Sequence, residues 1–241
     1  MKELETLLIE SARSFGINIT NEQICQFMLY KDILLETNKK FNLTAITDDR
    51  DVILKHFIDC LSVLKFYDFT LVRNIIDIGS GAGFPAIPLK IVLPSLHVTI
   101  VDSLNKRINF LKDVVSELNL LDVTCIHERA EILGCNQDYR EKFDICTSRA
   151  VAYLPMLSEY CLPFVRPNGY FLAMKGPNNI QEEIDNSLTI INQLGGCFEK
   201  IENYLIPHTD ISHNIIFIRK NNITPKKYPR KTSQIKNNIT C

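Results

Sequence analysis

Apolar residues recur at helical spacing through the first seventy residues. Leu4, Leu7 and Leu8 begin the pattern, and it continues from residue 24 to residue 35. Asn21, which directly precedes Glu22, is typical of an N-cap between two helices. A third helix is predicted over 50–67, where the apolar residues share one face. We therefore expect residues 1–70 to form a helical layer that packs on the main domain.

From residue 71 the pattern changes to short β-rich runs separated by helical segments. The predicted strands are 74–79, 97–102, 123–128, 143–149, 169–175, 199–205 and 214–220. Amphipathic stretches lie between the first five, most clearly at 103–119 and 152–164, and this alternation predicts βαβ units and a mostly parallel sheet. No helix separates the last two runs. We therefore expect an α/β domain over 71–220 whose seven-stranded sheet ends in an antiparallel hairpin.

Composition indicates a folded protein. The chain has 241 residues, of which 46% are hydrophobic, so it can bury a substantial core, and disorder as the main state is excluded. The formal net charge is −1, so the average composition indicates neither a nucleic-acid nor a membrane partner.

The average charge hides an uneven distribution. Residues 1–210 carry a formal charge of −8, whereas residues 211–241 carry +7 and contain no acidic residue. We expect 221–241 to be a basic C-terminal tail, kept extended by its prolines, with Tyr228 available for stacking on a base. Such a tail suits contacts with RNA phosphates. The alternative is a solvated end that aids solubility.

The N-terminal sequence and the cysteines indicate a cytoplasmic protein. Acidic residues stand where a signal peptide needs a basic patch, and no run of eighteen uncharged apolar residues follows, so no membrane partner is expected. The eight cysteines form neither a C-x-x-C motif nor a cluster with zinc-ligand spacing. We expect free thiols, mostly buried, and no metal site.

The strongest chemical signal is the sequence IIDIGSGAGFP at 75–85. An apolar strand runs into Gly79, Gly81 and Gly83 and then into a helix. Glycine permits this tight turn and lets a ligand approach the main chain at the carboxyl edge of the sheet. Asp102 ends the next predicted strand, where a carboxylate can accept hydrogen bonds from ribose hydroxyls. These four residues are therefore predicted to bind a nucleoside-containing cofactor.

Phe84 helps to identify that cofactor. It occupies the position at which the dinucleotide fingerprint G-x-G-x-x-G requires its third glycine, so a pyrophosphate-containing cofactor is disfavoured. S-adenosylmethionine, which contains no phosphate, fits the motif better. The alternative is a glycine turn beside a surface aspartate, with no ligand.

The sequence at the end of the fourth predicted strand helps to identify which atom of the substrate is methylated. Enzymes that methylate exocyclic amines usually carry an Asn/Asp-Pro-Pro-aromatic tetrapeptide there, whereas this chain has DICTSRA at 144–150. The cationic Arg149 cannot accept an N–H, but it can hold a phosphate or a base oxygen. This favours a target atom with a free lone pair, such as a purine ring nitrogen. The alternative of Cys146 as a nucleophile for carbon methylation lacks the usual neighbouring proline.

Several blocks of sequence resemble the ribosomal small-subunit RNA methyltransferase G family, also called glucose-inhibited division protein B. They are NKKFNLT at 38–44, KH-x-x-D at 55–59, the glycine loop with its continuation to 90, DS-x-x-KR at 102–107, RAE at 129–131, SRA at 148–150 and KG at 175–176. The resemblance covers nearly the whole chain. It implies a Rossmann-like class I methyltransferase fold and an S-adenosylmethionine-dependent enzyme that methylates N7 of a guanine in 16S rRNA. The implied partner is small-subunit rRNA or the small ribosomal subunit.

The resemblance also implies which residues contact the cofactor. They are Gly79, Phe84, Ala130, Glu131 and Arg149. All follow predicted strands whose carboxyl ends line one crevice. Phe84 and Ala130 can flank the adenine while Asp102 binds the ribose. The alternatives are core packing for Phe84 and a favourable helix-dipole contact for Glu131.

Guanine N7 carries a lone pair and no proton at neutral pH, so its methylation requires positioning and no general base. We expect Arg149, Lys175, Asn42 and His56 to orient the guanine and its phosphates. Each has a structural alternative. Arg149 and Lys175 can pair with carboxylates at the sheet edge, Asn42 can cap a turn, and His56 can hydrogen-bond Asp59 one helical turn away.

Three other functions are open at this point. A methyltransferase acting on another RNA or on a small molecule shares the glycine loop, but a small-molecule enzyme has no use for the basic tail. A non-catalytic RNA-binding module is disfavoured by the intact loop and Asp102, and a dehydrogenase is disfavoured by Phe84.

Overall fold

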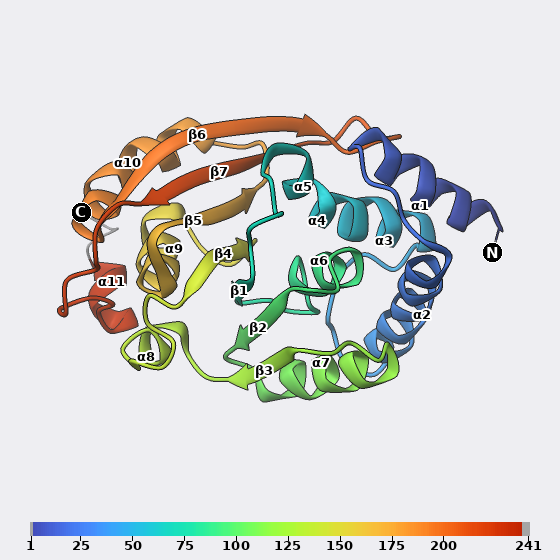
Figure 1. The fold of residues 1–241 in the computed structure, drawn as a ribbon, viewed down its shortest axis with the longest axis horizontal. Helices are drawn as coiled ribbons and strands as arrows, with labels where there is room; N and C mark the ends of the chain where they lie inside the picture. Colours follow the sequence, from blue (N-terminus) through green and yellow to red (C-terminus); the bar gives the residue numbers. More distant parts are fainter. Residues whose placement is uncertain (1, 238–241) are drawn as a thin grey trace.

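Seven strands form one sheet in the order β3-β2-β1-β4-β5-β7-β6 (Figure 1). The computed structural model describes residues 2–237. Strands β1 to β5 pair in parallel, and β7 runs antiparallel between β5 and β6. The strands are β1 (Asn74–Ile78), β2 (His97–Asp102), β3 (Val123–His127), β4 (Phe143–Arg149), β5 (Val165–Lys175), β6 (Gly196–Leu205) and β7 (Ser212–Lys220). The predicted mostly parallel sheet with a final antiparallel hairpin is confirmed.

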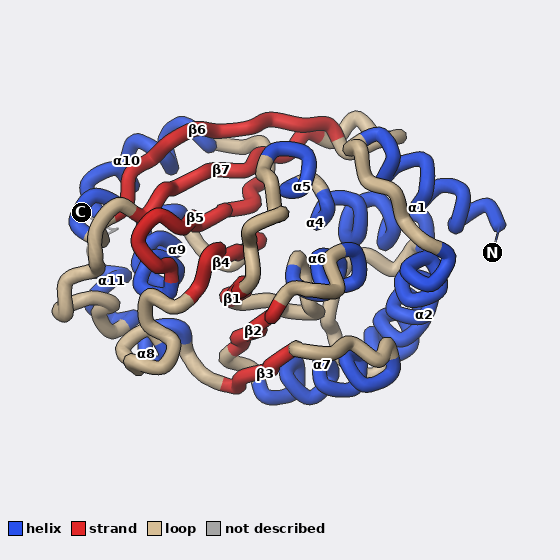
Figure 2. The backbone as a smooth tube through the Cα atoms, in the orientation of Figure 1, coloured by secondary structure: helices blue, strands red, loops and turns tan. Residues whose placement is uncertain are grey.

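Helices cover both faces of the sheet, with α1–α7 on one side and α8–α11 on the other (Figures 1 and 2). The helices are α1 (Lys2–Ser14), α2 (Asn21–Asn38), α3 (Asp49–Val52), α4 (Asp59–Leu61), α5 (Val63–Phe66), α6 (Ala86–Val92), α7 (Asn105–Glu117), α8 (Ala130–Leu133), α9 (Leu154–Cys161), α10 (Ile180–Gln193) and α11 (Thr232–Asn237). None of the helices within 2–237 is both long and apolar enough to cross a membrane.

The N-terminal helices differ from the prediction in two local details. Thr20, not Asn21, caps α2, because its hydroxyl accepts a hydrogen bond from the Gln23 amide while the Gln23 side chain accepts one from the Thr20 amide. The third predicted helix, 50–67, is built from α3, a π-helical turn at Ile53–Ile58, α4 and α5. A π-helical turn breaks the regular hydrogen-bond ladder and is frequent at functional sites.

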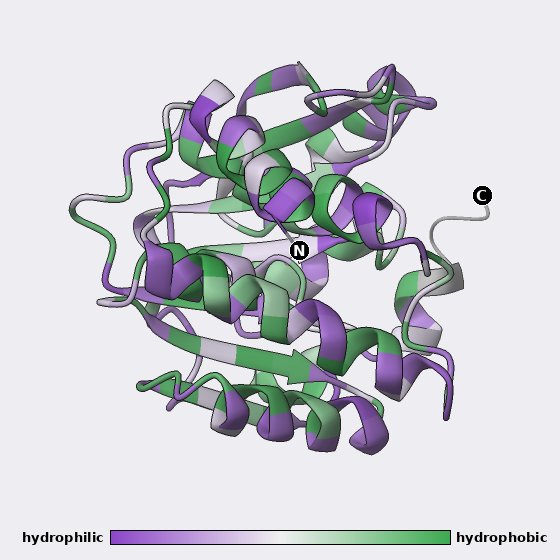
Figure 3. Cartoon of the chain, turned by 90° about the vertical axis from the view of Figure 1, so that its right-hand side faces the viewer, coloured by the Kyte–Doolittle hydropathy of each residue, from purple (hydrophilic) through white to green (hydrophobic). Residues whose placement is uncertain are grey.

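Two apolar clusters fill the two sides of the sheet. On β1, Ile75 joins the cluster that contains Leu8 and Phe27 from the N-terminal helices, whereas the next residue, Ile76, joins the cluster that contains Phe171. Strand residues alternate between the two faces, so each face of β1 is covered by helices. Figure 3 looks onto the N-terminal side, where hydrophilic and hydrophobic stretches alternate along the helices. The N-terminal helices thus share a core with the sheet.

Strand β5 begins earlier than predicted because it contains a bulge. Phe143 pairs with Val165, but the next pair along the two strands is Ile145 with Tyr170. The intervening Pro-Asn-Gly sequence, which is typical of a turn, is therefore absorbed as extra residues within the strand. Strand β6 likewise begins at residue 196 rather than 199 and has an irregularity in its pairing with β7.

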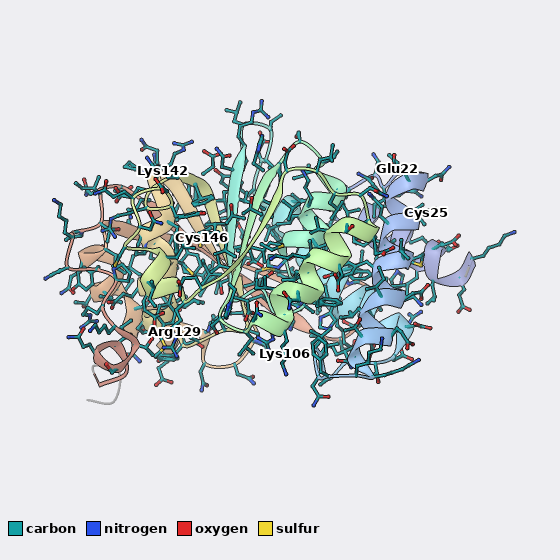
Figure 4. All side chains as sticks on the ribbon, turned by 90° about the horizontal axis from the view of Figure 1, so that it is seen from below. Glu22, Cys25, Lys106, Arg129, Lys142 and Cys146 are labelled. Atoms are coloured by element: carbon teal, nitrogen blue, oxygen red, sulfur yellow. The ribbon has the colours of Figure 1, made fainter. Side chains whose placement is uncertain are left out.

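The prediction that most cysteines are buried is wrong. All seven described cysteines are free thiols, but Cys60, Cys146 and Cys161 are buried, Cys125 is intermediate, and Cys25, Cys135 and Cys197 are exposed. Figure 4 shows Cys25 on the outer helix α2 and Cys146 in the interior. Cysteine is frequently buried as a residue type, but its neighbours decide the individual position. Cys241 lies outside the described residues.

The prediction of an extended tail from residue 221 is also wrong for the described part. Tyr228 is only 4% exposed, so its ring is not available to stack on a base. Lys220 is buried, and the Arg230 guanidinium binds the buried Glu159 carboxylate at 2.7 Å. Polar contacts and single apolar residues hold this segment, which explains why apolar periodicity did not reveal it. Residues 238–241 of the predicted tail lie outside the described residues.

Exposed lysines on the same segment still give it a basic surface. Lys226, Lys227 and Lys231 are all exposed. The predicted division into 1–70, 71–220 and 221–241 stays a prediction. Apolar clusters cross both boundaries: Phe27 and Ile75 belong to the first cluster, and Tyr228 belongs to the second.

Gly83→Ala should destabilise the protein far more than Gly81→Ala. A Cβ at Gly83 would lie 2.7 Å from the Tyr30 hydroxyl and 2.8 Å from both Ile87 and Leu111, whereas a Cβ at Gly81 meets nothing within 4 Å. Backbone strain acts in the same direction, because the φ of Gly81 is 62°, within the left-handed region open to other residues, whereas that of Gly83 is 102°, beyond it. We expect an additional loss of about 1–3 kcal/mol for Gly83→Ala, measured by urea unfolding. Equal losses would contradict this packing role.

Candidate functional site

Two cavities open at the carboxyl ends of the parallel strands. The first, here called the Asp102 pocket, is lined by Gly79, Asp102, Ala130, Glu131, Tyr160 and Thr232, among others. The second, the Arg149 pocket, is about 460 Å³ in volume and is lined by His56, Asp59, Arg149, Lys175, Glu183 and His213, among others. Val151 lines the first cavity and Ala150 the second, so the segment after β4 forms a wall between them.

The glycine loop and Asp102 form one edge of the Asp102 pocket. Asp102 Oδ2 accepts hydrogen bonds from the Gly81 amide at 3.0 Å and from Arg107 at 3.3 Å, and Oδ1 accepts one from the Leu104 amide at 2.9 Å. A carboxylate has about four acceptor positions, so one on Oδ1 remains for a ligand hydroxyl. A Cβ at Gly79 would lie 2.5 Å from Val151, so glycine is required where the loop meets the wall.

Ala130 and Glu131 form the opposite edge, at the start of α8. Glu131 Oε1 accepts a hydrogen bond from the Thr232 hydroxyl and lies 3.5 Å from an Arg129 nitrogen. Among the described residues, Oε2 has no hydrogen-bond partner. It is therefore available to accept a hydrogen bond from an N–H donor on a ligand. Together with Asp102, this acceptor suits a nucleoside with hydroxyls at one end and an amine at the other.

Phe84 lies outside the Asp102 pocket. Its ring is 5% exposed, stacks on His56 with ring centroids 4.4 Å apart, and has the Arg149 guanidinium 5.0 Å from its centroid. These contacts favour the core-packing alternative for the Phe84 side chain. Both of these partners line the Arg149 pocket. Gly83 likewise serves packing, since Tyr30 and neighbouring side chains leave no room for a Cβ there.

Arg149 faces the second pocket and joins β4 to the N-terminal helices. Its guanidinium donates to Asp59 Oδ2 at 2.7 Å, to the Lys55 carbonyl at 3.1 Å and to His56 Nδ1 at 2.8 Å. Lys55 and His56 belong to the π-helical turn. The structural alternative, pairing with a carboxylate, is therefore present for Arg149. Three of its five N–H donors are used, so two remain for a ligand.

Asp59 is the centre of this network. It is 1% exposed and also accepts hydrogen bonds from the Tyr204 hydroxyl at 2.7 Å and from His213 Nδ1 at 2.8 Å. Burial alone raises the pKa of Asp59, but the His213 hydrogen bond and the Arg149 charge outweigh it and leave the pKa below its usual value. Asp59 therefore stays ionised, with three of its about four acceptor positions occupied.

His56 is held neutral. Burial, together with the Arg149 charge, lowers its pKa to about 3. Because Nδ1 accepts from Arg149, the proton resides on Nε2, which donates to the Thr44 hydroxyl at 2.8 Å. The alternative of a direct His56–Asp59 hydrogen bond is not what the structure shows, since both side chains meet Arg149 instead. His56 is thus poorly suited to take up a proton.

Lys175 is brought to the Arg149 pocket, but Asn42 is not. Lys175 Nζ pairs with Glu183 at 2.6 Å and donates to the Ala152 carbonyl at 2.9 Å. Asn42 is exposed and lines neither pocket. The turn that it was a candidate to cap is held by Asn38, whose Oδ1 accepts hydrogen bonds from the amides of residues 43 and 44.

Sequence reasoning missed several residues of the two pockets. They are His213 on the hairpin, Glu183 on α10, Tyr160 on α9, and Thr232. Tyr204 on the hairpin, also missed, lines neither pocket but donates a hydrogen bond to Asp59. One signal was available: β7 pairs antiparallel with β5, Asn214 opposite Lys175, so the start of β7 had to reach the carboxyl edge. Within 2–237, no three or more His, Cys, Asp or Glu side chains are arranged to hold a metal ion.

Comparisons with known proteins agree on one family. A family model described as rRNA small subunit methyltransferase G matches residues 23–196. A relative from Acetivibrio thermocellus, named ribosomal RNA small subunit methyltransferase G, is 52% identical over 233 residues, which cover 96% of this chain and 95% of the relative. A relative of the same name from Alkaliphilus oremlandii is 48% identical over 232 residues, covering 96% and 97%.

Solved structures show the fold. The structure named StiE O-MT has a TM-score of 0.56 at 12% identity and covers 79% of this chain and 83% of that one. The YcgJ protein from Bacillus subtilis has a TM-score of 0.50 at 15% identity, covering 69% and 100%. With the strand order described above, these similarities confirm the predicted Rossmann-like class I methyltransferase fold.

The neutral state of buried His56 should make the fold sensitive to acid. An unfolded histidine binds a proton near pH 6.5, whereas folded His56 stays neutral until about pH 3. Between these values the unfolded state binds more protons, so stability falls as the pH falls, by up to about 1.4 kcal/mol per pH unit. The free energy of unfolding of the wild-type chain, measured in urea, should fall between pH 7 and pH 5. In His56→Gln this fall should be smaller by about 1–2 kcal/mol.

The matched control is His97→Gln, because His97 is exposed at the start of β2. It should keep the pH dependence of the wild-type chain. If His56→Gln keeps it as well, a neutral His56 is not the cause of acid sensitivity.

Proposed function

Because the chain belongs to the rRNA small subunit methyltransferase G family, we propose that it transfers the methyl group of S-adenosylmethionine to N7 of a guanine in 16S rRNA. In this proposal the cofactor occupies the Asp102 pocket and the guanine enters the Arg149 pocket. One observation supports the choice of N7. In the Arg149 pocket, Arg149 offers hydrogen-bond donors, while the neighbouring His56 and Asp59 are unsuited to remove a proton.

The Asp102 pocket fits the chemistry of the cofactor. Asp102 Oδ1 has a free acceptor position for a ribose hydroxyl, and Glu131 Oε2 can accept from the adenine amine. Gly79 brings the main chain close, the Gly81 amide holds Asp102, and Ala130 lines the far edge. When bound, S-adenosylmethionine supplies an electrophilic methyl group on a sulfonium. Three other residues predicted to bind the cofactor do not line this pocket: Gly83, Phe84 and Arg149. In this proposal they shape the neighbouring structure.

The Arg149 pocket suits a guanine that reacts through N7. Its O6 lies beside N7 and accepts hydrogen bonds, and Arg149 has two donors to spare. N7 carries no proton, so the reaction needs no base. Neither His56 nor Asp59 supplies one, because the pKa of each is lowered. Alignment of two reactants at contact distance can lower a barrier by about 7–11 kcal/mol. These residues therefore act by positioning.

The other functions fit the site less well. Methylation of an exocyclic amine calls for acceptors after β4, where this chain places Arg149. A small-molecule substrate leaves the exposed Lys226, Lys227 and Lys231 without a role, whereas RNA phosphates provide one. We therefore propose small-subunit rRNA, free or within the subunit, as the partner, and the cytoplasm as the place of action.

The function is tested by N7-methylguanosine in small-subunit rRNA. We expect it to be lost from one position when the gene is deleted and restored by the wild-type gene, as measured by mass spectrometry of rRNA fragments. Complementation with an Arg149→Ala gene should leave the position unmethylated. An unchanged methylation pattern after deletion would contradict the proposal.

Arg149→Ala should abolish methyl transfer while sparing cofactor binding, because its guanidinium faces the guanine pocket. We expect the rate with small-subunit RNA to fall about 100-fold or more, as is typical when a reactant is mispositioned. The dissociation constant of S-adenosylhomocysteine should change by less than about threefold, since no contact in the Asp102 pocket is removed.

Two variants control this experiment. Arg166→Ala removes an arginine that binds Asp144 near the opposite end of β4, and it should stay fully active. Arg149→Lys keeps a positive charge beside Asp59, so the fold is preserved, but it lacks the planar fork that reaches both His56 and the base. Full activity of Arg149→Lys would show that the fork is not needed.

A further inference from the structure

The C-terminal segment 224–235, here called the strap, forms part of the Asp102 pocket. We propose that Thr232 of the strap is a positioning residue for Glu131, and that it makes the pocket selective for the 6-amino group of adenine. This inference rests on the proposed binding of S-adenosylmethionine in that pocket. It assigns a cofactor-related role to a segment whose sequence indicated contact with RNA or a solvated end.

The strap is anchored firmly beside the pocket. Arg140, at the end of the loop that follows α8, donates to the strap carbonyls of Thr224 at 2.7 Å, Tyr228 at 2.9 Å and Pro225 at 3.2 Å. One guanidinium thus satisfies three strap carbonyls as well as the carbonyl of Gly134 at 2.8 Å. The strap and the loop that follows α8 are consequently held as one unit.

Three further residues fix the strap on both sides of Thr232. Arg230 binds Glu159, whose carboxylate is fully buried, through both its main-chain amide at 2.6 Å and its guanidinium at 2.7 Å. Ile235 is only 2% exposed. Pro229 lies so close to α8 that a Cβ on Gly134 would be 3.1 Å from its ring. Thr232 therefore reaches the pocket from a backbone that is restrained before and after it.

Thr232 connects α9 to the Glu131 carboxylate through hydrogen bonds. Its hydroxyl donates to Glu131 Oε1, because an ionised carboxylate can only accept. The Tyr160 hydroxyl, 3.1 Å from Thr232 Oγ1, must then donate to Thr232. All three side chains line the Asp102 pocket. This chain of bonds occupies Oε1 and fixes the carboxylate, which leaves Oε2 as its free acceptor.

A fixed acceptor at this place distinguishes adenine from hypoxanthine. The 6-amino group of adenine donates a hydrogen bond, whereas the oxygen at the same position of hypoxanthine faces the carboxylate with a second acceptor. A site built around one hydrogen bond rejects an analogue that cannot make it, because its buried polar groups are left unpaired. Without the Thr232 hydroxyl, the carboxylate can rotate and this discrimination weakens.

The test compares two ligands by isothermal titration of the full chain: S-adenosylhomocysteine and S-inosylhomocysteine, in which oxygen replaces the 6-amino group. The wild-type chain should bind the adenine compound at least about tenfold more tightly. Thr232→Val should weaken it about tenfold and change binding of the inosine compound less than about twofold. Thr232→Ser, which keeps the hydroxyl, should retain the wild-type ratio.

Thr6→Val is the matched control, because Thr6 is exposed on α1 and lines neither pocket, and it should leave both affinities unchanged. If Thr232→Val keeps the wild-type ratio, whether or not both affinities fall together, the strap is a packing element only and the inference is overturned. If the wild-type chain binds neither ligand, the proposed function itself fails. The two failures are therefore distinguishable.

Discussion

The buried carboxylate of Asp59 is the constraint on which the candidate site depends. Three donors from distant parts of the chain meet on it: Arg149 at the end of β4, Tyr204 on β6 and His213 on β7. Burying a carboxylate is costly, so hydrogen bonds from these three donors stabilise its burial. The shape of the Arg149 pocket is consequently tied to the packing of the N-terminal helices against the sheet and its hairpin.

The fold and the core of the Asp102 pocket could be predicted because their signals are local. An apolar run that enters a glycine turn marks the end of a strand, and the ends of parallel strands share one edge, so Gly79, Asp102 and Ala130 had to lie close together. The same logic brought Lys175 to the neighbouring pocket.

The remaining assignments depended on contacts that residue type does not reveal. Phe84 packs on His56 because aromatic side chains of the N-terminal layer lie next to it. Asn38, and not Asn42, caps the turn, because its side chain accepts hydrogen bonds from the amides of residues 43 and 44. The basic charge near the C-terminus could be counted, but the pairing of Arg230 with Glu159 could not be foreseen, since that partner lies 71 residues earlier.

The antiparallel insertion of β7 has a consequence for when the protein becomes functional during its synthesis. His213 and Asp59 are 154 residues apart in the sequence, and β7 fills a gap between β5 and β6 in the finished sheet. A nascent chain that has completed the five parallel strands still lacks the hairpin donors to Asp59. The contacts around Asp59 can therefore form only after nearly the whole polypeptide has left the ribosome. Contacts between residues so far apart in the sequence are typical of slow folding.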